Sequence, residues 1–80
     1  IMPNPANQQF TLKINTLKPI PQLTISIVDL RGRVVAEYKR SKPAGLSNFD
    51  FPVYKLAKGK YAVVVYDGQN RIASKELVKL

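Results

Sequence analysis

The sequence contains neither cysteine nor histidine. Their absence excludes disulfides, thiolate nucleophiles, zinc sites of the usual kind and the commonest general base. Nor is there a run of about 20 apolar residues that could span a membrane, or a visible signal peptide. The fold must therefore be held by packing alone, in a chain of 80 residues that buries only about 60% of its unfolded surface.

Acidic residues are also scarce, with five against 13 lysines and arginines. Asp29 and Asp67 fall in turn motifs, and Glu37 and Glu76 fall at outward strand positions beside lysines. Neither a pair of carboxylates facing across a cleft nor the acid spacing of a calcium loop is visible. We therefore expect a binding, structural or targeting module with no catalytic residue, no cofactor and no metal.

The net charge of +8 predicts attraction to anionic partners. The basic residues are spread along the chain, however, and no dense basic run is interleaved with aromatic residues. This distribution is typical of a solvated basic exterior. We expect weak, non-specific binding to nucleic acid and no specific nucleic-acid site.

Apolar and polar residues alternate along most of the chain, which predicts strands. The segments are 10–14, 23–30, 34–40, 48–52, 61–67 and 71–80. In the third, alternation places Val34 on the inward face with Ala36 and Tyr38, opposite Val35. In the last, the parity changes between Ile72 and Leu77, which predicts a bulge near Ser74. No segment has helical periodicity longer than two turns.

Turn signals separate these segments. The sequence DLRG places Asp29 and Gly32 at the first and fourth positions of a type I turn, which predicts a hairpin over residues 23–38. DGQN at 67–70 predicts a second hairpin, with Asp67 and Gly68 at positive φ. Proline-containing connectors are expected at 15–22 and 39–48, the second long enough to cross between sheets.

About seven short antiparallel strands without a helix predict a single all-β domain over residues 1–80, an immunoglobulin-like β-sandwich. In LAKGKY, Gly59 and Tyr61 precede the most apolar strand. This is the position of a tyrosine corner, in which the hydroxyl bonds back to the chain upstream. The spacing equally allows an ordinary strand tyrosine.

Several of these stretches together resemble one family. They are PNPA at 3–6 leading into FTLKI, TISIVDLRGRVV, NFDFPVYKLAKGKYAVVVYDG and the final KELVKL. Their order and spacing are similar to those of the type A C-terminal sorting domain of the type IX secretion system of Bacteroidota. The resemblance covers nearly the whole chain. Met2 stands where that family usually has an aromatic or branched residue, and Lys58-Gly59-Lys60 is a more basic form of its turn.

The resemblance implies a folded address label behind a secreted cargo, so the chain is expected to be a fragment of a longer protein. An outer-membrane shuttle protein would recognise it, and a cell-surface sortase would cleave it upstream of Ile1. The cargo would then be released or joined to an anionic lipopolysaccharide. The protein would pass through the periplasm and the outer membrane to the cell surface or beyond.

The matching positions give the expected signal residues. They are Pro3, Asn4, Pro5, Asp29, Gly32, Gly59, Tyr61, Lys75, Glu76, Leu77, Val78, Lys79 and Leu80. Within this set, the terminal Lys79-Leu80 is the best candidate for direct contact, and an exposed last strand can also add to a partner's sheet. The same strand could be exchanged between two copies, giving a strand-swapped homodimer.

The alternative is an immunoglobulin-like accessory module that binds carbohydrate or another protein beside a catalytic domain. A sugar-binding module usually presents two or three aromatic side chains on one face. Most aromatic residues here fall at inward positions, and only Tyr54 and Tyr66 are expected outside. This pattern favours the sorting domain over a sugar platform.

Overall fold

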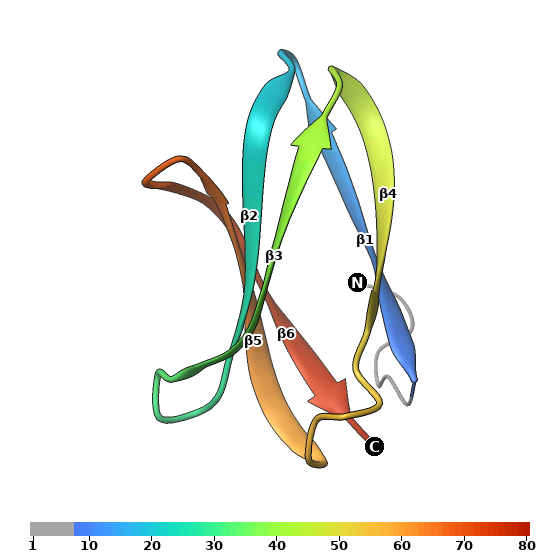
Figure 1. Ribbon diagram of the computed structural model, residues 1–80, viewed down its shortest axis with the longest axis vertical. Coiled ribbons are helices and arrows are strands. Elements are labelled where there is room, and N and C mark those ends of the chain that lie inside the picture. Colours follow the sequence, from blue (N-terminus) through green and yellow to red (C-terminus); the bar gives the residue numbers. More distant parts are fainter. Residues whose placement is uncertain (1–7) are drawn as a thin grey trace.

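A computed structural model describes residues 8–80, which form six strands in two antiparallel sheets and include no helix that could cross a membrane (Figure 1). The strands are β1 (Gln9–Thr16), β2 (Ile20–Val28), β3 (Val34–Lys42), β4 (Gly45–Pro52), β5 (Gly59–Asp67) and β6 (Asn70–Lys79). The all-β sandwich is confirmed, with six described strands instead of about seven. Each alternating segment makes one strand, and none of the connectors between these strands contains another.

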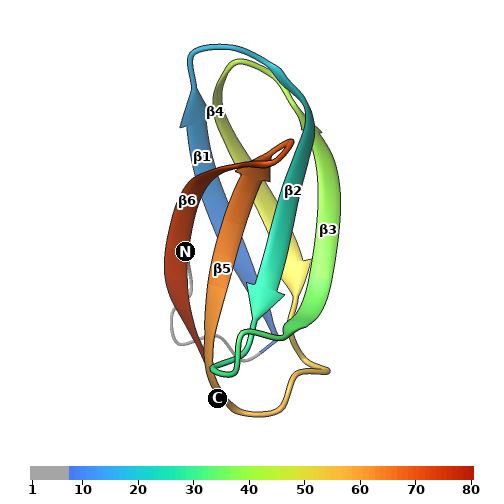
Figure 2. The same cartoon turned by 90° about the vertical axis from the view of Figure 1, so that its left-hand side faces the viewer.

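The two sheets are unequal in width. β1 pairs with β4, while the larger sheet has the order β3-β2-β5-β6, and Figure 2 shows this sheet in front of β1 and β4. The chain crosses between the sheets at 17–19, 43–44 and 53–58. The connector predicted at 39–48 does cross, but it is only two residues long because β3 and β4 extend into it.

Apolar side chains from all the strands except β3 form the fully buried core. Its members from the larger sheet are Ile20, Leu23, Ile25, Ile27, Val63, Val65 and Leu77, and Phe10, Leu12 and Phe51 face them from the smaller one. Burying one such side chain stabilises the fold by about 1.5–3 kcal/mol. As predicted, β5 is apolar on both faces, since Val64, directed away from this core, is also buried.

Aromatic contacts close the side of the sandwich where β3 meets β4. The rings of Tyr38 and Phe51 lie 4.7 Å apart, and the Arg40 guanidinium lies 5.3 Å from the centre of the Phe51 ring. At the adjacent corner the buried Lys42 side chain donates hydrogen bonds to the carbonyl oxygens of Pro43 and Gly45, at 2.8 and 2.5 Å. These contacts join the two sheets along one edge.

One bulge in β3 changes the sheet face on which two residues lie, and a second bulge lies in β6. Ile27 pairs with Ala36 but Val28 pairs with Val34, so Val35 is an extra residue in β3. Val35 therefore packs against the core and Val34 is exposed, and the prediction for these two residues was wrong. The bulge expected near Ser74 exists two residues earlier, at Ile72, between the pairs Val65–Ala73 and Tyr66–Arg71.

Both predicted hairpins are present. In the second, Gly68 alone has positive φ, at +62°, and Asp67 does not. Asp67 instead ends β5 and pairs with Asn70, which leaves a two-residue loop with glycine first, as in a type II′ turn. The Cα atoms of the described residues span 35 × 22 × 16 Å.

Candidate recognition surface

Several predicted signal residues gather at one end of the sandwich. This end, called here the C-terminal end, consists of the turn 29–33, residues 53–61 and residues 77–80, at the bottom of Figures 1 and 2. It contains Asp29, Gly32, Gly59 and Tyr61. The predicted Pro3, Asn4 and Pro5 lie outside the described residues.

The Asp29 carboxylate organises its own turn. It accepts hydrogen bonds from the backbone N–H groups of Arg31 and Arg33, at 2.9 and 3.0 Å, and from the Arg33 guanidinium at 3.3 Å. The N–H of Gly32 donates to the Asp29 carbonyl at 3.0 Å, which confirms the predicted turn, and the φ of +86° at Gly32 suits glycine. The hydrogen bond from the Arg33 N–H, more than the Arg33 charge, holds the pKa of Asp29 below its ordinary value of 3.8.

A tyrosine corner follows the loop 53–58. The Tyr61 hydroxyl donates a hydrogen bond to the carbonyl oxygen of Ala57 at 2.6 Å, which is the back-bonding that defines the motif. Between them, Gly59 has a φ of +148° and is exposed. Of the two readings of Tyr61, the structure therefore supports the corner.

The predicted signal residues 75–80, called here the tail, differ in exposure. Leu77 is fully buried in the core, and Lys79 is only 8% exposed, with its ammonium donating to the Leu80 carbonyl at 2.8 Å. Leu80 is 61% exposed, Lys75 and Glu76 are exposed, and Val78 is half-buried. Within the pair Lys79-Leu80, the Leu80 side chain is thus the more accessible to a partner. Direct contact by this pair stays a prediction.

Two shallow hollows of about 290 and 230 Å³ lie along the turn 29–33 and the Tyr61 corner, and the larger one extends to Lys75 and Glu76. Both are lined by Asp29, Leu30, Lys60 and Tyr61; the larger also reaches Lys75 and Glu76, and the smaller Arg31, Lys58 and Gly59. The sequence analysis did not single out Leu30 or Arg31, and it noted Lys58 and Lys60 only as a more basic form of the family's turn. The sequence did contain a signal for Leu30, because an apolar residue at the second position of a turn has no strand to bury it. In the structure Leu30 is 82% exposed.

The surface has the chemistry of a docking site more than of a reaction centre. Leu30 and Leu80 offer apolar contact, and Arg31, Lys58 and Lys60 surround Leu30 with positive charge. Among residues 8–80, no three histidine, cysteine or acidic side chains come together as a metal site would require.

The two aromatic side chains expected outside do not share a face. Tyr54, 62% exposed, lies in the loop 53–58, whereas Tyr66 is half-buried and pairs with Thr24 across the larger sheet, directed away from the core. A planar sugar normally stacks on aromatic rings that lie in one surface. This arrangement therefore does not favour the carbohydrate-binding alternative.

The comparisons with known proteins identify the family to which the chain belongs. A family model described as "Secretion system C-terminal sorting domain" matches residues 1–79. No curated protein and no solved structure matches the chain. Domains of this family mark proteins for export across the outer membrane to the cell surface or beyond. The chain therefore belongs to the family of C-terminal sorting domains of the type IX secretion system.

Proposed function

We propose that this domain is a non-catalytic address label for a cargo fused upstream of residue 1, and that the secretion machinery reads it at the C-terminal end. The observation that carries the proposal is the meeting of the Asp29 turn and the Tyr61 corner around two adjoining hollows, the larger of which also reaches Lys75 and Glu76. Segments about 15 to 45 residues apart in sequence are thereby presented together to one partner.

An outer-membrane shuttle protein is the proposed reader. The exposed leucines, Leu30 and Leu80, supply apolar contact area, and the neighbouring cations supply attraction to an acidic site on that reader. Gly32 and Gly59 support the reading indirectly, since they let the chain adopt the two turns. Leu77 also supports recognition indirectly, because its packing in the core holds β6 in place.

After export, a cell-surface sortase is proposed to cut the chain upstream of Ile1. The cargo would then be released or joined to an anionic lipopolysaccharide. Cleavage predicts that the reporter recovered outside the cell has lost the mass of this domain. Recovery of the uncut fusion outside the cell would contradict the sortase step alone.

The burial of each side chain decides which variants can test recognition of the domain. Deletion of residues 76–80 would remove the buried Leu77 and unfold the end of β6, so a loss of export would not distinguish recognition from folding. We therefore choose Leu30→Ser and removal of Leu80, which alter exposed side chains. Leu46→Ser on β4, where the leucine is 66% exposed, is the matched control.

The experiment places a reporter ahead of residues 1–80 in a host that has a type IX secretion system. We expect export with the unchanged domain and with Leu46→Ser, and periplasmic retention with Leu30→Ser or without Leu80. Circular dichroism of the purified variants checks that each is folded. Normal export of both test variants would place the address elsewhere, and export of the reporter without the domain would contradict the sorting function itself.

A further inference from the structure

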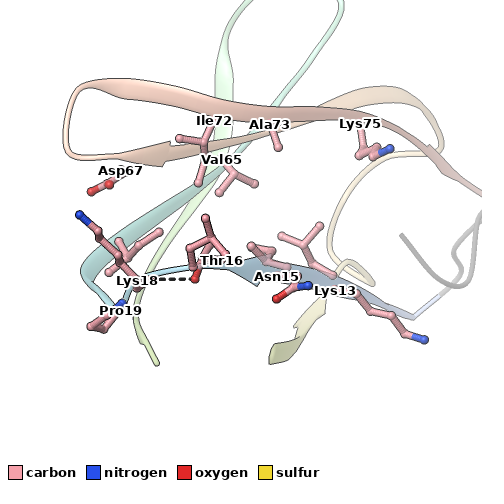
Figure 3. Close-up of a pocket in the computed structure, with 14 residues that line it drawn as sticks. Lys13, Asn15, Thr16, Lys18, Pro19, Val65, Asp67, Ile72, Ala73 and Lys75 are labelled. Carbon is pink, nitrogen blue, oxygen red and sulfur yellow. Dashed lines mark hydrogen bonds between the residues drawn. The ribbon is translucent and has the colours of Figure 1, made fainter. Parts of the chain in front are cut away.

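The side of the sandwich opposite the Tyr38–Phe51 contact is open. A groove of about 660 Å³ runs there between β1 with its following connector and the β5–β6 hairpin (Figure 3). Leu12 and Ile14 line one wall, and Val65, Ile72 and Ala73 line the other. This volume lies within the range of about 300–1,000 Å³ that is typical of ligand-binding clefts. The groove lies outside the hollows of the C-terminal end, although Lys75 borders both.

The groove exists because the smaller sheet is too narrow to cover the larger one. In the part of the chain that the structure describes, β1 pairs only with β4, so one edge of β1 has no neighbouring strand. Across the groove, Ala73 and Lys75 of β6 are exposed, and Ile72 at the bulge is 44% exposed. A third strand beside β1 would satisfy the free backbone groups of β1 and cover this apolar surface.

The charges around the groove favour an acidic occupant. Three lysines, Lys13, Lys18 and Lys75, line it against one carboxylate, Asp67, and no ion pair between these residues is present. Lys13 is an exposed residue of β1, so an acidic residue on a neighbouring strand would lie beside it. A second copy of this chain, itself at +8, would bring further positive charge to the same rim.

We propose that this groove binds an extended acidic segment of a partner protein, which adds to the free edge of β1 as a third strand of the smaller sheet. About five residues of the segment lie alongside Leu12–Thr16, because a strand of that length matches the part of β1 that borders the groove. Its inward side chains cover Ile72 and Ala73. The proposal does not depend on recognition at the C-terminal end.

The test uses the chain of 80 residues and two fluorescent, capped peptides, one alternating glutamate with valine and the other lysine with valine. We expect anisotropy to show binding of the acidic peptide and no binding of the basic one. Amide exchange measured by NMR should slow along β1 when the acidic peptide is added. Ala73→Glu, which adds a carboxylate to an exposed position in the groove, should weaken binding about fivefold or more.

Reversing the charge of single lysines tests the contribution of the groove, and a lysine away from the groove supplies the matched control. Lys13→Glu and Lys75→Glu should each weaken the acidic peptide about two- to fivefold. Lys39→Glu, at an exposed position of β3, makes the same change of net charge away from the groove and should have a smaller effect. Equal loss in all three variants would overturn the proposal, because it would reduce the binding to net charge.

Two further outcomes would also overturn the proposal. One is protection of amides elsewhere than in β1 when the acidic peptide binds. The other is protection of the β1 amides without peptide, together with a dimeric mass in light scattering, which would assign the groove to a second copy. None of these measurements depends on export. The groove proposal can therefore be wrong while the sorting function is right, and the sorting function can be wrong while the groove proposal is right.

Discussion

At the residue scale, Asp29 shows how one side chain can hold a whole turn. Its carboxylate accepts hydrogen bonds from two backbone N–H groups and a guanidinium, while its carbonyl oxygen accepts the hydrogen bond from the Gly32 N–H that closes the turn. A charged acceptor makes stronger hydrogen bonds than a neutral one. The ionised form of Asp29 is therefore favoured in the folded state.

We predict that Asp29→Asn lowers stability near neutral pH and that the difference from the unchanged protein shrinks in acid. The pKa of Asp29 is lower in the folded state than its ordinary value of 3.8. The unfolded state therefore takes up the proton first, and the stabilisation, fully present above the ordinary value, is lost as the pH falls below it and through the lower folded-state pKa. Urea unfolding at about pH 7 and about pH 3 measures the effect.

The matched control for this prediction is Asp67→Asn, which removes a carboxylate from the turn between β5 and β6. If the gap between Asp29→Asn and the unchanged protein is the same at both pH values, the charge of Asp29 contributes nothing and the prediction is wrong.

At the element scale, β6 combines structural and accessible residues within a few positions. Leu77 is buried at 0% exposure, whereas Leu80 just beyond the strand is 61% exposed. We predict that Leu77→Ala costs about 2–5 kcal/mol of unfolding free energy, because it leaves a cavity in the core. Leu80→Ala should change it by less than about 0.5 kcal/mol.

Urea denaturation of both variants at one pH measures these costs. Similar costs for the two variants would mean that Leu80 is also packed, and removal of Leu80 would then no longer be a clean test of recognition.

The sequence predicted the positions of the strands better than it predicted the sheet face on which each side chain lies. Alternation located every described strand, and the DLRG and DGQN motifs located both hairpins. The faces of Val34 and Val35 were misjudged because one bulged residue reverses the parity of those beyond it, and alternation alone cannot place the bulge. The length of β3 was underestimated because Lys42 reads as a loop residue, although its ammonium is satisfied by two carbonyls at the corner.

The candidate site was predicted in part for a related reason. Asp29, Gly32, Gly59 and Tyr61 came from turn chemistry and from the family resemblance, both of which the sequence displays. Leu30 and the cations beside it become a surface only when the turn 29–33 and β5 lie side by side. That neighbourhood depends on the strand order, which is a property of the fold.

At the scale of the whole molecule, net charge governs association. We predict that the isolated domain forms a strand-swapped dimer, with β6 exchanged, only at high protein concentration. Because each copy carries +8, added salt should favour the dimer by screening repulsion. Light scattering over a range of concentrations at low and moderate salt measures this, and a monomeric mass throughout would contradict it.

The molecule's dimensions also bear on the passage it must take. Viewed along its longest axis, the fold presents a cross-section of 22 × 16 Å between Cα atoms, and the side chains extend beyond that. A conduit that admits the domain end-on in its folded state must open wider than this cross-section. Such an aperture would leak small solutes unless something closed it, so a conduit that admitted the folded domain would need a closed state between passages.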